Sequence, residues 1–500
     1  MSVAGIPVLH NHINNKATAA VSASGEAQLL AVTSPYTGET IAHVPLSTSK
    51  DVDAAVEAAT KALAEWSRLT LKARAAYLLR LYTALQAQAD ELVALIVREH
   101  GKTYTEAQGD LSKGLETLEY AIGLPQLAQG HVQMVSGGVQ CRDERVAVGV
   151  VAGIVPFNFP FMVPFWTIPL ALGMGNTYVL KPSEKVPMTM TRVAEIAASV
   201  LPPGVLNIVH GDRTAAIALT EHSHVHAVAF VGTSAVAEQV HRRGVAAGKR
   251  VLALGGAKNH LVALPDCDVE LTAQDVVNSF TGCAGQRCMA ASVLLVVGEQ
   301  PELLRRIVAK AQALVPASKG PGAMGPVIDA AALERIEAAI MHATDIDGAT
   351  VLLDGRANDR FATCRREKGG FWIGPTVLCH KAASDQALQQ EIFGPVLSVL
   401  HCDSFDAALA IENASAYGNA ACVYTSSGAH AEYFAQRFGA AMVGINIGVP
   451  VPREPFSFGG VKRSKFGSSD ITGDGAIEFF SVRRKITTKW AVSTEKSWMN

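Results

Sequence analysis

From residue 147 onward, short apolar segments alternate with helix-like segments, and this alternation limits the possible folds more than any other feature of the chain. The predicted strands are 147–155, 177–181, 205–210, 226–231 and 250–254, and the predicted helices between them are 162–174, 189–201, 213–221 and 234–247. These strands are almost uninterrupted runs of Val, Ile, Leu and Ala, as is typical of strands buried on both faces. The alternation therefore predicts an α/β fold with a parallel sheet covered by helices on both sides.

A second α/β region is predicted after Leu254 to Asn259, a segment that contains Gly255-Gly256 and suits a hinge. Its predicted strands are 260–264, 292–297, 349–353, 395–401, 420–424 and 442–446, and its predicted helices are 269–280, 301–314, 329–343, 404–412 and 429–437. Asp51 to Tyr120 predicts a series of amphipathic helices. A chain of 500 residues is too long for a single ordinary core, so we expect two or three domains.

Charge and cysteine content exclude several classes of protein. The 43 basic and 45 acidic residues give a net charge of −2, so we expect neither a nucleic-acid partner nor an anionic membrane surface. Eight cysteines are scattered without Cys-x-x-Cys spacing, which indicates reduced thiols in a reducing compartment. We expect a cytoplasmic protein, or a mitochondrial matrix protein in a eukaryote.

Residues 146–180 contain no charged side chain and are long enough to span a bilayer. However, Pro156, Pro160, Pro164 and Pro169 would break a continuous membrane helix. No basic segment followed by an apolar run is visible at the N-terminus, so we expect no secretory signal. Residues 146–180 are therefore predicted to be buried structure that lines a site.

Residues 280–292 are where we expect the chemistry. Cys288 follows small residues, including Gly282 and Gly285, that let the backbone approach a ligand closely. The neighbouring Arg287 would favour the thiolate, which is the nucleophilic form of cysteine. The alternative interpretation is a buried cysteine on a glycine-rich turn, where the thiol acts as a small apolar group.

Three loops follow strands of the first region, at the sheet edge where open α/β sheets bind ligands. They are 156–160, 181–184 and 231–234. In the third loop, Gly232 and two hydroxyl residues open a helix, an arrangement suited to a phosphate. Lys181 could contact ribose or phosphate and Glu184 could accept ribose hydroxyls, or both could be ordinary loop charges. His222, His224 and His226 lack an accompanying carboxylate or cysteine cluster, so we predict no metal site.

Five motifs together resemble the aldehyde dehydrogenase superfamily in order and spacing. They are Pro156-Phe157-Asn158-Phe159-Pro160, Lys181-Pro182-Ser183-Glu184, Gly255-Gly256, Gly285-Gln286-Arg287-Cys288 and Glu391-Ile392-Phe393-Gly394-Pro395. The resemblance extends from about residue 10 to 490. Residues 256–260 and 285–289 are most similar to the CoA-acylating branch, the methylmalonate-semialdehyde dehydrogenases.

The resemblance implies two doubly wound parallel-sheet domains and a small oligomerisation arm. It divides the chain into an NAD-binding domain (1–127 and 148–254), a catalytic domain (255–440) and an arm (128–147 and 478–500). The tail of the chain alternates in the manner of a strand added to another element. We therefore expect a homo-oligomer, with a tetramer favoured.

The resemblance also implies roles for individual residues. Cys288 would attack the aldehyde carbon, and the Asn158 amide with the Cys288 backbone N–H would hold the oxyanion. NAD would be held by Val155, Phe157, Lys181, Glu184, Lys185, Ser234, Gly256, Glu391 and Phe393. Glu184 would disfavour the 2′-phosphate of NADP because of its negative charge.

Two departures from the superfamily bear on the substrate and the acyl acceptor. Hydrolytic members carry a general-base Glu two residues before Gly-Gly, where this chain has Ala253, so CoA is the expected acceptor. In the acylating branch two arginines hold a substrate carboxylate, and here they correspond to Arg287 and Lys113. The helical pattern instead makes Lys113 a solvated residue.

The expected reaction is the conversion of methylmalonate or malonate semialdehyde to propionyl-CoA or acetyl-CoA with loss of CO2. NAD is the expected cofactor and CoA the co-substrate. The alternatives are a hydrolytic NAD-dependent aldehyde dehydrogenase and a non-catalytic protein that retains the fold.

Overall fold

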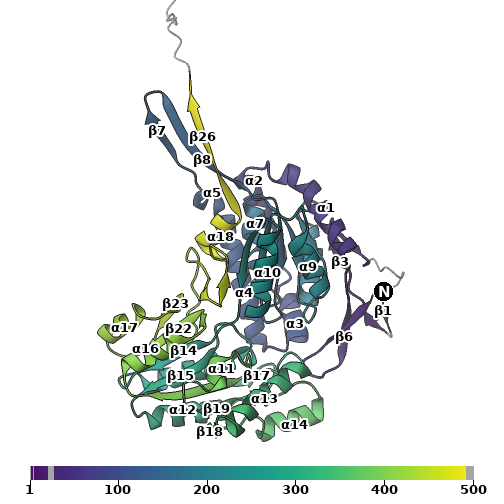
Figure 1. The fold of residues 1–500 in the computed structure, drawn as a ribbon. Helices are drawn as coiled ribbons and strands as arrows, with labels where there is room; N and C mark the ends of the chain where they lie inside the picture. The colour runs from purple at the N-terminus through teal and green to yellow at the C-terminus, as the bar shows by residue number, and fades with distance from the viewer. Residues whose placement is uncertain (1, 4, 21–27, 491–500) are drawn as a thin grey trace, which may run out of the picture.

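The computed structural model describes residues 2–3, 5–20 and 28–490. In Figure 1, a unit coloured purple to teal lies above a mostly green unit, and a three-stranded sheet projects from the upper one. The upper unit contains an eight-stranded sheet and the lower unit a seven-stranded sheet. The predicted α/β class with two sheet-based units and a projecting arm is therefore confirmed.

The first sheet has the strand order β25-β13-β12-β9-β10-β11-β3-β4. Its parallel centre consists of β9 (Val150–Ile154), β10 (Thr177–Lys181), β11 (Leu206–Ile208), β12 (Ala227–Val231) and β13 (Arg250–Leu254). Antiparallel strands complete both edges: β3 (Asn11–Ile13) with β4 (Lys16–Thr18), and β25 (Lys465–Phe466). The edge strands were not predicted, because each is too short to show a pattern.

Side chains alternate across this sheet and pack into two separate cores, as the strand period of two requires. Leu252 and Leu254 of β13 face one core, whereas Val251 and Ala253 face the other. The first core is covered by α2 (Leu71–Gln86), α3 (Ala89–His100), α4 (Tyr104–Ile122), α7 (Ile168–Gly173) and α8 (Met188–Ala198). The second is covered by α1 (Ser49–Trp66), α9 (Arg213–Glu221) and α10 (Ser234–Ala246).

The predicted helix 162–174 is wrong as a single element. It is divided into α6 (Met162–Phe165) and α7, with Pro169 in the first turn of the second piece. Proline has no N–H for the helical hydrogen bonds and is tolerated only at the start of a helix.

No helix among the described residues has the length and apolar character needed to cross a membrane.

The second sheet has the order β18-β19-β20-β15-β14-β22-β23. The strands are β14 (Asn259–Ala263), β15 (Ala291–Val297), β18 (Thr350–Leu353), β19 (Thr376–Cys379), β20 (Val396–Cys402), β22 (Ala420–Tyr424) and β23 (Met442–Ile445). All neighbours are parallel except the edge pair β18–β19. The covering helices include α11 (Val269–Thr281), α12 (Pro301–Gln312), α13 (Ala330–Asp345), α16 (Phe405–Ala414) and α17 (Gly428–Ala435).

Several short elements of the second unit were not predicted, among them β19 and α14. Strand β19 is only four residues long, and α14 (Asp359–Lys368) buries only Phe361 and Cys364. Neither segment carries a repeated apolar pattern that periodicity could detect.

The projecting arm contains β7 (Val132–Ser136), β8 (Val139–Ala147) and β26 (Ser481–Lys489). Strand β26 pairs antiparallel with the whole of β8, as expected for an added C-terminal strand. The first two residues of the predicted tail strand instead end helix α18 (Gly473–Phe479), and residues 491–500 lie outside the described residues.

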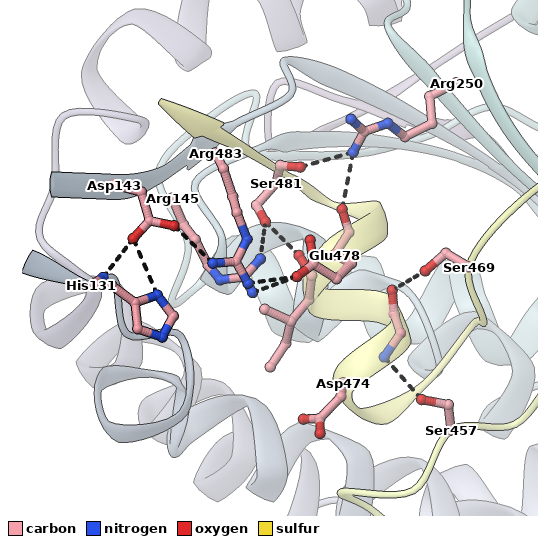
Figure 2. Close-up of polar contacts among 12 residues, drawn as sticks. His131, Asp143, Arg145, Arg250, Ser457, Ser469, Asp474, Glu478, Ser481 and Arg483 are labelled. Carbon is pink, nitrogen blue, oxygen red and sulfur yellow. Dashed lines mark hydrogen bonds and ion pairs between the residues drawn. The ribbon is translucent and has the colours of Figure 1, made fainter. Parts of the chain in front are cut away.

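An arginine of the first sheet holds the base of this arm, as Figure 2 shows. Arg250 Nη1 donates to the carbonyl oxygens of Glu478 (3.0 Å), Phe479 (2.7 Å) and Ser481 (2.8 Å). Arg483 joins Glu478 to Asp143 of β8, with both contacts at 2.8 Å. The arm is thereby attached to β13 of the first sheet by charge-assisted hydrogen bonds.

Substitution of Arg250 by Met should loosen the arm, because three carbonyl oxygens lose their donor. Hydrogen bonds from a charged donor contribute about 1.5–3 kcal/mol each, so we expect a lower Tm and faster proteolysis between residues 478 and 490. Arg484→Met is the control, since Arg484 is exposed on β26 of the arm. Equal protease sensitivity of the two variants would contradict this account of the attachment.

Candidate functional site

A cavity of about 490 Å³ lies between the two units, at the carboxyl ends of β9 and β12. The first unit contributes the loops that follow β9, β12 and β13, together with part of α6. The second unit contributes Cys288, the start of α13 and the turn that contains Glu391 and Phe393. This is the edge at which open α/β sheets bind ligands, as expected from the sequence.

The segment that precedes Cys288 has an unusual backbone. Cys283, Ala284 and Gly285 have φ values of 52°, 53° and 71°. A Cβ atom on Gly285 would lie 2.1 Å from the carbonyl oxygen of Gly394, so only glycine fits there. Positive φ at non-glycine residues costs about 1–3 kcal/mol each and occurs where the surroundings enforce it, often at functional sites.

The backbone of Cys288 is held by two asparagines of the second unit. The Nδ2 atoms of Asn259 and Asn419 donate to the Cys288 carbonyl oxygen at 2.7 and 2.9 Å. Asn259 begins β14, and Asn419 directly precedes β22, which pairs with β14. The second sheet therefore orients the thiol, although the sequence singled out neither asparagine.

Arg287 acts on the pKa of the Cys288 thiol in the expected direction, but burial has the larger effect. Burial raises the pKa of the Cys288 thiol to about 12, and the charge of Glu391 acts in the same direction. Arg287 lowers this pKa, but less than burial raises it. The guanidinium group is engaged elsewhere, since Arg287 Nη2 donates to the carbonyl oxygens of Asn278 (2.6 Å) and Ser279 (2.8 Å).

Asn158 lines the same cavity as Cys288, as the predicted pairing of these residues requires. It is buried in the loop after β9, and its backbone carbonyl oxygen accepts a hydrogen bond from Lys102 Nζ at 2.8 Å. A primary amide beside a thiol can donate to an oxygen that becomes negatively charged when sulfur adds to a carbonyl.

Glu391 lies against the glycine pair that connects the two units. Its Oε1 accepts from the Ala257 backbone N–H at 3.0 Å, and a Cβ on Gly256 would lie 2.3 Å from Oε2. Burial raises the pKa of Glu391 to about 7 and lowers the pKa of Lys258 to about 7. Lys258 is buried, and its Nζ has no hydrogen-bond partner among the described residues. The opposite charges of these two residues attract one another, and this attraction partly offsets the effect of burial on the two pKa values.

Three further predicted cofactor-binding residues line the cavity together. Phe157 and Phe393 meet edge to face with ring centroids 5.8 Å apart. Lys185 Nζ lies 5.3 Å from the Phe157 ring centroid and 2.5 Å from an Asp329 carboxylate oxygen. Phe393 has a positive φ of 54°, a conformation that a bulky residue adopts only when the surroundings require it.

The other predicted cofactor-binding residues are not among the cavity-lining residues. Val155 is buried in the first core. Lys181 and Glu184 pair with each other at 2.9 Å. Although burial opposes its ionisation, the pKa of Glu184 is lowered because Lys181 is adjacent. Ser234 Oγ donates to the Arg463 carbonyl oxygen at 2.7 Å and accepts from Gly256 N–H at 2.9 Å.

At the start of α10 the cavity is lined by Gly232 and Thr233, one residue earlier than the predicted Ser234. Thr233 is the N-cap residue, and its side chain makes no capping hydrogen bond. The helix therefore presents backbone N–H groups near the cavity, an arrangement that binds phosphate. Together with the Glu391 carboxylate and the two aromatic rings, these residues fit a dinucleotide. The sequence motif identified this loop, and the neighbouring hydroxyl residue Thr233 is the one that lines the cavity.

The two predicted substrate-binding residues are placed differently. Arg287 lines a small second pocket together with Cys288 and Glu391. Lys113 lies on α4 with a side chain that is 38% exposed, and it pairs with Glu116 at 2.7 Å. Glu116 also contacts Arg453 at 3.2 Å. Lys113 does not line the cavity, in agreement with the helical pattern that placed it on a solvated face.

Ala253 stands two residues before Gly255-Gly256, where the resemblance places the general base of hydrolytic members. It is buried in the second core, beside Phe230 in the strand register. The next residue, Leu254, is buried in the first core. Neither residue is among those that line the cavity, and neither carries a carboxylate.

The described residues contain no group of three or more His, Cys, Asp or Glu side chains placed to hold a metal ion. His222 Nε2 instead lies 3.3 Å from an Asp53 oxygen, and His226 Nδ1 accepts from Val150 N–H at 3.2 Å.

Comparison with known proteins agrees with this arrangement. The aldehyde dehydrogenase family profile matches residues 21–486. The chain is 40% identical to malonate-semialdehyde dehydrogenase 1 of Geobacillus thermodenitrificans, over 97% of this chain and 99% of that protein. The protein described here therefore belongs to the aldehyde dehydrogenase family.

Two solved structures have the same fold over nearly the whole chain. A methylmalonate-semialdehyde dehydrogenase from Oceanimonas doudoroffii superposes with a TM-score of 0.93 at 37% identity, covering 98% of this chain and 99% of that one. A Sinorhizobium meliloti protein assigned as a methylmalonate-semialdehyde dehydrogenase, complexed with NAD, gives 0.94 at 35% identity with the same coverage.

The raised thiol pKa predicts the pH dependence of Cys288 alkylation in the free enzyme. Because only the thiolate reacts, the rate with iodoacetamide should rise about tenfold per pH unit from pH 7 to 10. Glu391→Gln removes a negative charge that raises this pKa, so its profile should shift to lower pH. Asp329→Asn alters another carboxylate of the cavity and is the control. A plateau below pH 8 in the wild type, or equal shifts in both variants, would contradict the prediction.

Proposed function

We propose that this protein oxidises a short aldehyde that bears an acid group, with NAD as oxidant and CoA as acyl acceptor. Malonate semialdehyde and methylmalonate semialdehyde are the proposed substrates. The observation that carries the proposal is the cavity in which Cys288 and Asn158 meet, together with the lack of a carboxylate at Ala253, the position of the hydrolytic base in the resemblance. The names of the similar proteins point to the same substrates.

The chain supplies a nucleophile and an oxyanion site. The Cys288 thiol gives its proton to solvent water and its sulfur adds to the aldehyde carbon, and the Asn158 amide with the Cys288 backbone N–H stabilises the resulting alkoxide. NAD would supply the hydride acceptor when bound, and the residues at the start of α10 together with Glu391 would hold it. Loss of hydride from the thiohemiacetal leaves an acyl thioester on the Cys288 sulfur.

The carboxylates in the cavity are poorly placed to activate water. Asp329 caps α13 by accepting from Ala332 N–H at 2.8 Å and pairs with Lys185, while Glu391 accepts from Ala257 N–H. The CoA thiolate therefore displaces the acyl group from Cys288, which leaves as a thiolate. A carboxylate β to the thioester carbonyl departs as CO2, and the resulting enolate takes up one proton. The products are acetyl-CoA from malonate semialdehyde and propionyl-CoA from methylmalonate semialdehyde.

Arg287 is the proposed partner of the substrate carboxylate. Its Nε is buried and has no hydrogen-bond partner among the described residues, while Nη2 is engaged by two carbonyl oxygens. Lys113 would assist only if its ammonium group left Glu116, since that pair lies outside the cavity lining. Arg287 could therefore contact the substrate carboxylate directly, whereas Lys113 would first have to leave Glu116.

The arm is proposed to join copies of this chain into a homo-oligomer, with a tetramer favoured. On β7, Val132, Met134 and Val135 are each more than half exposed. A projecting sheet edge with apolar side chains favours pairing with another chain. The eight free cysteines suit the reducing cytoplasm, which is the proposed location.

NADH formation from malonate semialdehyde, measured with and without CoA, tests the proposal. Steady turnover should require CoA, and mass spectrometry should detect acetyl-CoA in equal amount to NADH. Equal turnover without CoA would establish the hydrolytic alternative and overturn the acylating one. Cys288→Ala should abolish turnover in either case.

Ala253→Glu should give the enzyme CoA-independent turnover, because it restores the carboxylate that hydrolytic members of the superfamily carry two residues before Gly255-Gly256. Ala253→Gln is the matched control, since it adds a side chain of the same size at the same buried position without a general base. NADH formation without CoA should rise at least tenfold in the first variant alone. An equal result in both variants would contradict the role given to the missing carboxylate.

A further inference from the structure

Helix α4 contacts both loops that form the reacting centre. The Asn158 loop belongs to the first unit and the Cys288 loop to the second, so their relative position is not set by either sheet alone. Three charged residues in and just before the first half of α4 reach these loops, namely Lys102, Glu106 and Asp110. They are spaced four residues apart, which places the helical members on one face.

Lys102 and Asp110 hold the Asn158 loop. Lys102 Nζ donates to Asp110 Oδ2 at 2.9 Å and to the Asn158 carbonyl oxygen at 2.8 Å. Asp110 Oδ1 accepts from the backbone N–H of Met162, four residues further along, at 2.7 Å. Both side chains of the ion pair are completely buried. The pair thus fixes the peptide on each side of the Asn158 to Met162 turn.

Glu106 holds the other loop. Its Oε1 accepts from the backbone N–H of Cys283 at 2.6 Å. Its Oε2 accepts from the N–H of Thr103 at 2.8 Å and from the Thr103 hydroxyl at 2.9 Å, which completes a capping box at the start of α4. One carboxylate therefore joins a helix terminus to the first residue of the strained segment.

The strained segment needs such a contact. Cys283 and Ala284 have positive φ without being glycine, so the isolated segment would relax to another conformation. Relaxation there would move Cys288, which follows within five residues. A displacement of about 1 Å between reacting groups can reduce a rate by about 100-fold.

We propose that Lys102, Glu106 and Asp110 form a brace on α4 that sets the position of the Cys288 thiol relative to the Asn158 amide. They are positioning residues, because they reach the reaction only through the two loops. The inference rests on the proposed roles of Cys288 and Asn158. It means that the three charged side chains affect the rate of the reaction and do not only stabilise the fold.

Glu106→Ala and Thr103→Ala provide a matched pair. Each removes the capping box and should lower Tm to a similar extent, but only Glu106→Ala releases the Cys283 N–H. We expect kcat to fall about 10- to 100-fold in Glu106→Ala with KM changed less than about threefold. Thr103→Ala should retain wild-type kcat. Glu106→Gln keeps one acceptor oxygen and should recover most of the rate.

Alkylation of Cys288 by iodoacetamide, located by peptide mapping among the eight free cysteines, gives a readout that needs no substrate. Its rate should change in Glu106→Ala and stay unchanged in Thr103→Ala. If the wild type failed to oxidise semialdehydes but this difference remained, the proposed function would fall and the brace would stand. If both variants matched in alkylation and in kcat, the brace would be overturned.

The buried pair is tested by the double variant Lys102→Met with Asp110→Leu. Replacing both charges with apolar groups leaves no unpaired buried charge, so the protein should fold. The Asn158 carbonyl and the Met162 N–H lose their partners, and kcat should fall at least tenfold while alkylation of Cys288 changes little. A folded double variant with wild-type kcat would show that the Asn158 loop needs no brace.

Discussion

The close packing around Gly255-Gly256 is the constraint on which the rest of the structure depends. Here the chain leaves β13 of the first sheet and enters the second unit. Gly255 N–H donates to the Ser464 carbonyl, and Gly256 contacts Ser234 Oγ on one side and the Ser464 hydroxyl on the other. Side chains at these glycines would meet Ser234 and Glu391. The two units can therefore face each other across a cavity only because this connection has no side chains.

Buried charge is the second feature shared by the site and its support. The half-buried Glu391 lines the cavity and attracts the buried Lys258, and the buried pair of Lys102 and Asp110 holds the Asn158 loop. Removing one partner of a buried pair costs about 3–5 kcal/mol, whereas replacing both is often neutral. Such pairs add little to the free energy of unfolding. Here they bind backbone carbonyl and N–H groups of loops, which have no hydrogen-bond partners in a sheet. The same low polarity raises the thiol pKa of Cys288, so proton removal is part of the chemical problem that the site must solve.

The strands of both sheets could be predicted closely because they are continuous apolar runs. Strands 177–181, 250–254 and 420–424 agree residue for residue with β10, β13 and β22. Elements whose stability comes from distant partners escaped prediction. Strand β19 is held between two neighbours, and β25 depends on β13, more than two hundred residues away. The prediction of a single helix over 162–174 was wrong because the apolar periodicity continues through Pro164 and Pro169. A continuous helical backbone cannot pass through these prolines.

The sequence by itself determined the family and the loops that meet at the cavity, and it predicted the nucleophile, since these depend on motifs whose residue types are visible in order. Tertiary structure alone decided which side chains line the cavity. Thr233 lines it and Ser234 does not, because one residue along a turn changes the direction of a side chain. Asn259, Asn419 and Glu106 carry no local signal. Their importance arises because folding brings them to the backbone of the Cys288 loop, where they satisfy polar groups that the loop cannot satisfy itself.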